Sequence, residues 1–163
     1  MELKKELLEI LGKDARASVA DMAVMVGASE EQVRTAIAEL ERDRVIIQYN
    51  TVIDWQKVGD ESVEALIEVK VTPQRGKGFD DIARRIYGFQ EVKSCYLMSG
   101  AYDLMVLIDG RSMRDVAFFV AEKLSTIDGV LSTATHFVLK KYKDNSVVVD
   151  DEVIEDNRLA VSP

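Results

Sequence analysis

The polar side chains that could make sequence-specific contacts lie on one face of residues 29–44. The solvent side of this segment carries Ser29, Glu31, Arg34, Thr35, Ala38 and Arg42. A guanidinium such as that of Arg34 can pair with guanine or bind a phosphate. Thr35 can donate to a phosphate or contact a thymine methyl group, and Glu31 can accept from cytosine or form only a local ion pair. This chemistry suits the edges of base pairs, provided that the segment is a helix able to enter a groove.

Catalytic and metal chemistry find few candidates elsewhere in the chain. Cys95 is the single cysteine, so an internal disulfide is impossible. His136 is the single histidine. One Cys, one His and carboxylates make a poor zinc site, and we expect neither a metal nor a cofactor. Cys95 lies in an apolar segment that favours packing. Gly76 and Gly78 lack the strand, helix and Lys-Ser ending of a phosphate-binding loop.

Two helices are expected to precede the polar face. Residues 2–11 repeat Leu and Ile at three- and four-residue spacing, and Gly12 is expected to end this helix. Ser18 opens a second helix, which Gly27 ends.

A third helix is expected at 29–44, because Ser29 and Gln32 form the signature of a capping box. The short turn at Gly27 lets this helix cross the second one steeply, as in a helix-turn-helix. An ordinary three-helix bundle with a solvated face is the alternative. Residues 45–54 are rich in β-branched side chains and predict one or two short strands.

The hydrophobic period changes after a connector. Alternating apolar residues predict a strand over 63–72 that Pro73 ends. The further predicted elements are a helix at 79–88, strands at 91–98 and 102–109, a helix from Ser112 to about 126 and a strand at 130–142. This β-α-β-β-α-β order is the ferredoxin-like arrangement. The fold class is therefore α+β, with a mainly helical domain at 1–54, a linker at 55–61, a sheet domain at 62–143 and an acidic tail at 144–163.

The strand at 102–109 is apolar on both of its faces. Two helices can cover only one face of a sheet, so the other face requires a partner. We expect a homodimer that packs through the sheets. The alternative is a face that is simply less exposed than the pattern indicates.

The charge is unevenly distributed along the chain. The net charge is −8, made up of −4 in residues 1–54, +1 in residues 55–143 and −5 in residues 144–163. Nonspecific attraction to phosphates should therefore be weak for the first domain alone. The charged N-terminus differs from a signal peptide, and no run approaches the roughly 20 apolar residues of a membrane span. We expect a cytoplasmic protein with no membrane association.

The segment from Ile10 to Asp54 resembles the DNA-binding domain of the Lrp/AsnC (leucine-responsive regulator) family. The matching motifs are Ile10-Leu11, Asp14-Ala15-Arg16, the turn at Gly27 and Ser29, Leu40-Glu41 and Val45-Ile46-Ile47. The second half is similar to the family's ligand-sensing domain, whose Gly-x-Tyr-Asp turn is matched by Gly100-Ala101-Tyr102-Asp103. The resemblance covers residues 2 to about 143.

This resemblance implies a winged helix-turn-helix, a dimer formed by the sensing domains and often a ring of four dimers. It also implies a small effector, often an amino acid, bound between subunits near the turn. The residues so implicated are Ser99, Gly100, Ala101, Tyr102, Asp103, Thr133 and Thr135. Gly100 allows close approach to a ligand carboxylate, and Asp103 could pair with an ammonium group. The alternative is a plain hairpin turn in which Asp103 pairs with a neighbour.

The sequence favours a regulator that binds double-stranded DNA and is tuned by a small effector, not an enzyme. The acidic first domain motivates one alternative, an oligomeric sensing module with weak or no DNA binding. Another is an enzyme that decarboxylates a modified tetrapyrrole, as relatives of this fold do. The resemblance disfavours it, because residues 45–54 lack the histidine expected of such a site.

Overall fold

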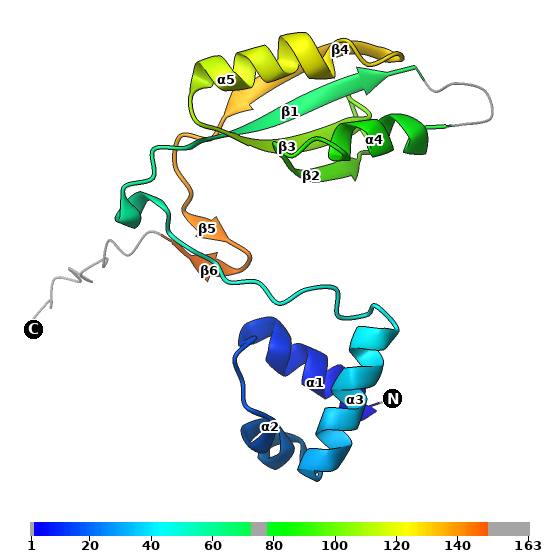
Figure 1. The fold of residues 1–163 in the computed structure, drawn as a ribbon, viewed down its shortest axis with the longest axis vertical. Coiled ribbons are helices and arrows are strands. Elements are labelled where there is room, and N and C mark those ends of the chain that lie inside the picture. Colours follow the sequence, from blue (N-terminus) through cyan, green and yellow to red (C-terminus); the bar gives the residue numbers. More distant parts are fainter. Residues whose placement is uncertain (1, 73–77, 150–163) are drawn as a thin grey trace, which may run out of the picture. The chain divides into compact units, whose positions relative to one another are not determined.

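The chain forms two units in the computed structural model, which describes residues 2–72 and 78–149 (Figure 1). The first unit spans Met1–Ile53 and the second spans Asp54–Pro163. The predicted strand end at Pro73, the excluded phosphate loop at Gly76 and the part of the acidic tail from residue 150 onward lie outside the described residues.

Helices α1 (Glu2–Lys13), α2 (Val19–Val26) and α3 (Glu30–Arg42) make up the first unit. Their apolar faces bury one small cluster, which consists of Leu7, Met22, Ala23, Val33 and Ala36. Leu7 and Val33 are fully buried, and they hold α1 and α3 together through the cluster. The helical prediction for this half is confirmed.

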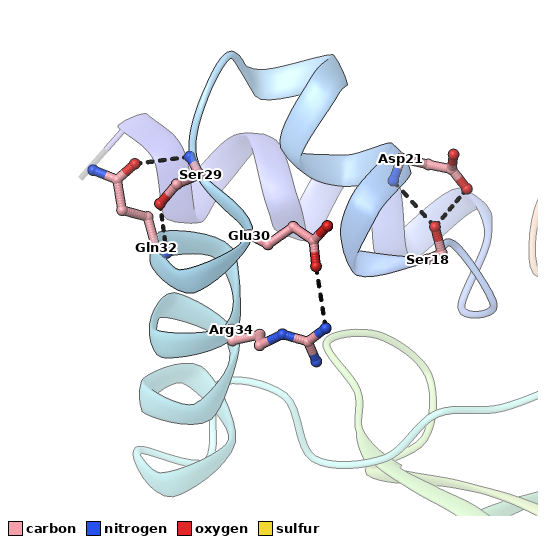
Figure 2. A network of polar contacts seen from close by, with 6 residues as sticks. All are labelled: Ser18, Asp21, Ser29, Glu30, Gln32 and Arg34. Atoms are coloured by element: carbon pink, nitrogen blue, oxygen red, sulfur yellow. Dashed lines mark hydrogen bonds and ion pairs between the residues drawn. The ribbon is translucent and has the colours of Figure 1, made fainter.

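The predicted caps close the helices at their expected residues (Figure 2). Ser18 Oγ accepts from the Asp21 amide at 3.1 Å, and Gly27 ends α2 in the left-handed conformation with φ 65°. Ser29 and Gln32 form a reciprocal capping box, in which Oγ accepts from the Gln32 amide at 3.2 Å and Oε1 accepts from the Ser29 amide at 2.9 Å. The third helix therefore starts immediately after the turn.

One predicted helix end is wrong. Gly12 lies inside α1, which continues to Lys13. The amide of Asp14 still donates to the carbonyl of Ile10 at 2.9 Å, so the helical hydrogen bonding persists past the glycine. Gly12 weakens the helix at this point without ending it.

The strands predicted at 45–54 do not form, so this wing is a loop. The amides of Val45 and Ile46 both donate to the carbonyl of Leu40, at 2.9 and 3.1 Å, and thereby close the end of α3. A strand also requires a neighbour to complete its ladder, and β-branched residues alone supply only a preference for extended backbone. A short 3₁₀ turn at Gln56–Val58 follows.

The second unit contains a four-stranded antiparallel sheet in the order β2-β3-β1-β4. Its strands are β1 (Val63–Val71), β2 (Val92–Leu97), β3 (Leu104–Gly110) and β4 (Val130–Phe137). Helix α4 (Asp80–Tyr87) and the helical segment formed by α5 (Met113–Phe118) and η2 (Phe119–Leu124) connect them. The predicted β-α-β-β-α-β order and the α+β fold class are confirmed.

Both helical segments cover the same face of this sheet. Ala65, Ile67 and Val69 of β1 are fully buried on that face. They join one cluster with residues of α4, of α5 and η2 and of β3. The opposite face carries the intervening residues of each strand.

The last predicted strand is too long and one helix is irregular. Strand β4 stops at Phe137, because its neighbour β1 begins at Val63 and offers no further partner. The last bond between them runs from the Val138 amide to the Glu64 carbonyl. A small hairpin, β5 (Lys143–Asp144) and β6 (Val147–Val148), follows. The helix after Ser112 changes to π geometry at η2. No helix among the described residues is long and apolar enough to cross a membrane.

Candidate functional site

The six side chains predicted to contact DNA are all exposed on or just before α3. Ser29 caps the helix, so its hydroxyl oxygen is already occupied by the Gln32 amide. Glu31, Thr35, Ala38 and Arg42 follow at spacings of three and four residues and so share one side of the helix. This outer side faces away from buried Val33, and its four side chains are exposed.

Both arginines of α3 have acidic partners. Arg34 Nη2 lies 3.2 Å from Glu30 Oε2, one turn earlier (Figure 2). Arg42 Nε donates to Asp43 Oδ1 at 2.9 Å, which raises the pKa of Arg42 and lowers the pKa of Asp43. Exposed pairs of this kind are weak, so each arginine can leave its partner when a stronger acceptor arrives.

A groove between α1 and α3 was not anticipated from the sequence. Its volume is about 450 Å³, and Glu31 and Thr35 line it together with Lys4 and Glu39. Lys4 Nζ lies 2.8 Å from Glu39 Oε2, and this bond lowers the pKa of Glu39. The pair joins positions 35 residues apart, and no local spacing signals such a contact.

The Gly-x-Tyr-Asp turn joins β2 to β3 at one end of the sheet. The Met98 amide donates to the Asp103 carbonyl at 2.8 Å, and the Asp103 amide donates to the Val69 carbonyl at 3.1 Å. Asp103 Oδ2 also accepts from the Val71 amide at 2.8 Å. The carboxylate therefore ties the turn to the end of β1, a contact that neither sequence interpretation included.

The other predicted effector residues lie near this end of the sheet at different depths. Ser99, Gly100 and Ala101 are exposed, whereas Tyr102 is half-buried. Thr133 pairs with Val69, the residue whose carbonyl accepts from Asp103, while Thr135 pairs with Ile67 further along β1. Both threonines share the helix-covered face with those buried partners and are half-buried. The structure thus brings Thr133 closer to the turn than Thr135.

A second hollow, of about 190 Å³, lies where β3 ends, at the opposite end of that strand from the turn. Its lining includes Asp109, Glu91 and Lys123, and the bond from Lys123 lowers the pKa of Glu91. The Lys123 ammonium also lies 5.8 Å from the centre of the Phe119 ring. These residues are far apart in sequence, so no local pattern predicts that they meet.

The single cysteine packs beside the hydrophobic core, and the single histidine lies beside a glutamate on the neighbouring strand. Cys95 packs against the core, and burial raises the pKa of its thiol, which disfavours the reactive thiolate. His136 Nε2 lies 3.4 Å from Glu68 Oε1 across neighbouring strands. Among residues 2–72 and 78–149, no group of three His, Cys, Asp or Glu side chains is arranged to hold a metal ion.

A helix-turn-helix, a fold common among DNA-binding proteins, followed by a β-α-β-β-α-β sheet defines the class of two-domain proteins to which this chain belongs. Residues 2–41 match the AsnC-type helix-turn-helix domain, and residues 64–148 match the Lrp/AsnC ligand binding domain. The chain belongs to the Lrp/AsnC family, a family of transcription regulators, as its motifs indicated.

Individual relatives agree with this assignment. The chain is 55% identical, over 99% of its length and 98% of the relative, to YugG, an uncharacterized HTH-type transcriptional regulator of Bacillus subtilis (strain 168). It is 32% identical to the HTH-type transcriptional regulator LrpA of Pyrococcus horikoshii, over 87% of this chain and 98% of that one. A transcriptional regulator of Neisseria meningitidis, solved in complex with L-Met, shares the fold with a TM-score of 0.73 and 22% identity, over 91% and 95% of the two chains.

Proposed function

We propose that this protein is a transcription regulator that binds specific double-stranded DNA through α3 and is tuned by a small effector, an amino acid, bound at its second unit. The observation that carries the first half is the capped turn at Gly27 and Ser29, which starts α3 abruptly and leaves its outer side exposed. We assign DNA binding to residues 1–54 and effector binding to residues 62–143, with 55–61 as linker and 144–163 as a tail outside both. Such a protein acts in the cytoplasm and performs no catalysis.

Binding to the region upstream of the protein's own gene, measured by fluorescence anisotropy at fixed salt, tests DNA recognition. Arg34→Ala should weaken binding to that duplex by about 1–3 kcal/mol if Arg34 contacts a base. Lys5→Ala is the matched control, because Lys5 is an exposed α1 cation paired with Glu9. Unchanged affinity of Arg34→Ala, with an unchanged thermal midpoint, would exclude the role of Arg34.

A sensing module with weak or no DNA binding is the second candidate, and the net charge of −4 in residues 1–54 favours it. The same anisotropy measurement separates the two functions. Equal affinity for the upstream region and for a scrambled duplex of the same length would support the sensing module.

The effector proposal is supported by the exposed turn at Gly100 and by the neighbouring Thr133. Calorimetry with the twenty amino acids tests it, starting with L-Met, the molecule bound to the Neisseria relative. Asp103→Ala should abolish binding, but it also removes the acceptor of the Val71 amide. Asp103→Asn is therefore the decisive variant, because it keeps an acceptor and loses the charge. If Asp103→Asn binds the ligand as well as the wild type, Asp103 does not pair with an ammonium group.

We also propose a homodimer that packs through the uncovered face of the sheet and can assemble further into four dimers. On that face Leu66 of β1 pairs with Leu107 of β3. Met105, two residues before Leu107 on β3, pairs with Tyr96 of β2. These side chains form an apolar patch between the exposed pairs Glu68–His136 and Lys93–Asp109. Leu107→Glu should convert the dimer to a monomer in sedimentation velocity, and a wild-type chain that sediments as a monomer at micromolar concentration would refute the proposal.

A further inference from the structure

We propose that the first unit holds the DNA backbone through three cations at its helix ends, Lys13, Arg16 and Arg44, which we call the end cations. The proposal deepens the proposed DNA binding and rests on it. It concerns contacts with phosphate, whereas the exposed side of α3 concerns contacts with bases.

The other four cations of the first unit each have an acidic partner within it. Ion pairs join Lys4 to Glu39, Lys5 to Glu9, Arg34 to Glu30 and Arg42 to Asp43. A paired cation that turns to a phosphate leaves its carboxylate beside the same phosphate, and the resulting repulsion cancels much of the gain. Each of these four cations therefore contributes less to attraction by the DNA backbone than a cation without an acidic partner does.

The end cations differ, because all three are exposed and none forms an ion pair within the described part of the chain. Lys13 is the last residue of α1, and Arg16 lies two residues before Ser18, the N-cap of α2. In a helix-turn-helix the helix that precedes the recognition helix crosses the DNA backbone, so the approach to α2 is a phosphate-facing position. The Arg16 amide donates to Asp14 Oδ1 at 2.9 Å, a local bond that shapes the turn between α1 and α2.

The backbone at Arg44 supplies an independent observation. Arg44 has φ 55°, in the left-handed region where glycine is favoured. Its amide donates to the Glu41 carbonyl at 3.0 Å, and the Val45 amide donates to the Leu40 carbonyl at 2.9 Å, which is the helix ending that usually has glycine at this position. An arginine here costs local strain, and a binding role for its side chain would account for that cost.

The end cations also account for DNA binding by an acidic domain. Counterion release depends on the cations that reach phosphates and not on the net charge of the domain. A net charge of −4 in residues 1–54 is therefore compatible with three phosphate contacts.

The test is the salt dependence of binding to a random-sequence duplex by the full chain. Each lost phosphate contact should reduce the slope of log K against log salt by about 0.9. We expect this reduction for Arg16→Gln, for Arg44→Gln and for Lys13→Gln. The matched control Lys5→Gln should keep the wild-type slope, and Arg16→Lys should keep it too because the charge remains.

Arg44→Gly separates phosphate contact from folding. It removes the strain as well as the charge, so the thermal midpoint of the first unit should rise while the salt slope falls. A purely structural Arg44 would leave the slope unchanged.

Wild-type slopes in Arg16→Gln and Arg44→Gln, with normal binding by the unmodified protein, would overturn the proposal and leave the proposed function intact. An equal fall of the salt slope in Lys5→Gln would also overturn the proposal, because the end cations would then contribute no more to phosphate binding than a paired cation does. Failure of the unmodified protein to bind any duplex would refute the proposed function and this inference together.

Discussion

The two units of the chain are held together over very different sequence distances. The first unit buries one small cluster under three helices, and its caps act between residues three positions apart, as Ser29 and Gln32 do. In the second unit β1 lies between β3 and β4, so Ile67 is paired with Val106 on one side and with Thr135 on the other. Local rules therefore shape the first unit, while distant pairing shapes the second.

This difference has a consequence for stability. A domain as small as the first unit rarely gains more than about 3–5 kcal/mol from a single core. The second unit has a larger buried cluster, to which the central strands and both helical segments contribute. We expect two unfolding transitions, with the first unit melting at the lower temperature.

The largest expected effect comes from Leu7→Ala, since Leu7 is fully buried in the small cluster. The change should cost about 2–5 kcal/mol, most of what such a unit possesses, and should unfold it. Differential scanning calorimetry should show loss of the lower transition with the upper one unchanged. Ile67→Ala is the corresponding variant of the second unit and should lower the midpoint of the upper transition only. A shift of both transitions in either variant would show that the units do not unfold independently.

A pair of glycine substitutions should move the two transitions in opposite directions. A Cβ on Gly129, where φ is +97°, would lie 2.8 Å from Ile82 Cδ1, so Gly129→Ala should destabilise the second unit by about 1–3 kcal/mol. A Cβ on Gly12 inside α1 would meet nothing within 4 Å, so Gly12→Ala should stabilise the first unit by about 0.5–1 kcal/mol. The calorimetric midpoints measure both changes, and destabilisation by Gly12→Ala would contradict the helical placement of that residue.

Removal of one cap tests how far the first unit depends on local hydrogen bonds. Ser29→Ala removes the acceptor of the Gln32 amide and should cost about 1 kcal/mol. The lower midpoint should then fall by roughly 4–8 °C, since the unit is small. Ser29→Asp is the control, because a carboxylate can cap the same amide and should restore most of the midpoint. An equal loss in both variants would indicate that the hydroxyl has another role.

The smallest expected effect is an acid response of the second unit. The bond from Lys123 lowers the pKa of Glu91 in the folded chain. The resulting stabilisation is fully present above the unfolded pKa of about 4.3 and is lost as the pH falls through the lowered folded value. Glu91→Gln should flatten the decline of the upper midpoint below about pH 4, by less than about 1 kcal/mol for so exposed a pair. An unchanged decline in this variant would show that other carboxylates govern the response.

The success of sequence-based prediction follows the same division between local and distant contacts. Ser18, Gly27 and Ser29 could be recognised as caps because each interacts within its own turn of chain. The alternation in β1 correctly predicted which side chains are buried, because a strand exposes its two faces in turn. The residues of the outer side of α3 could be proposed for the same reason, since helical spacing alone determines which side chains share a face.

Contacts between distant residues could not be predicted in this way. Residues 45–54 have the composition of strands, yet the amides of Val45 and Ile46 cap α3 and no neighbouring strand pairs with the rest. The Gly-x-Tyr-Asp motif indicated a turn, but only the folded sheet brings Asp103 to the amide of Val71, 32 residues away.

By itself the sequence determined the helix ends at Ser18, Gly27 and Ser29, the order of elements in the second unit and the family of the protein. Tertiary structure alone decided which cations of the first unit remain without an ion pair, which backbone amide the carboxylate of Asp103 binds and where β4 ends. The physical reason is that caps and alternating faces depend on neighbours along the chain. Ladders, ion pairs such as Lys4–Glu39 and strand ends depend on partners that only folding brings within reach.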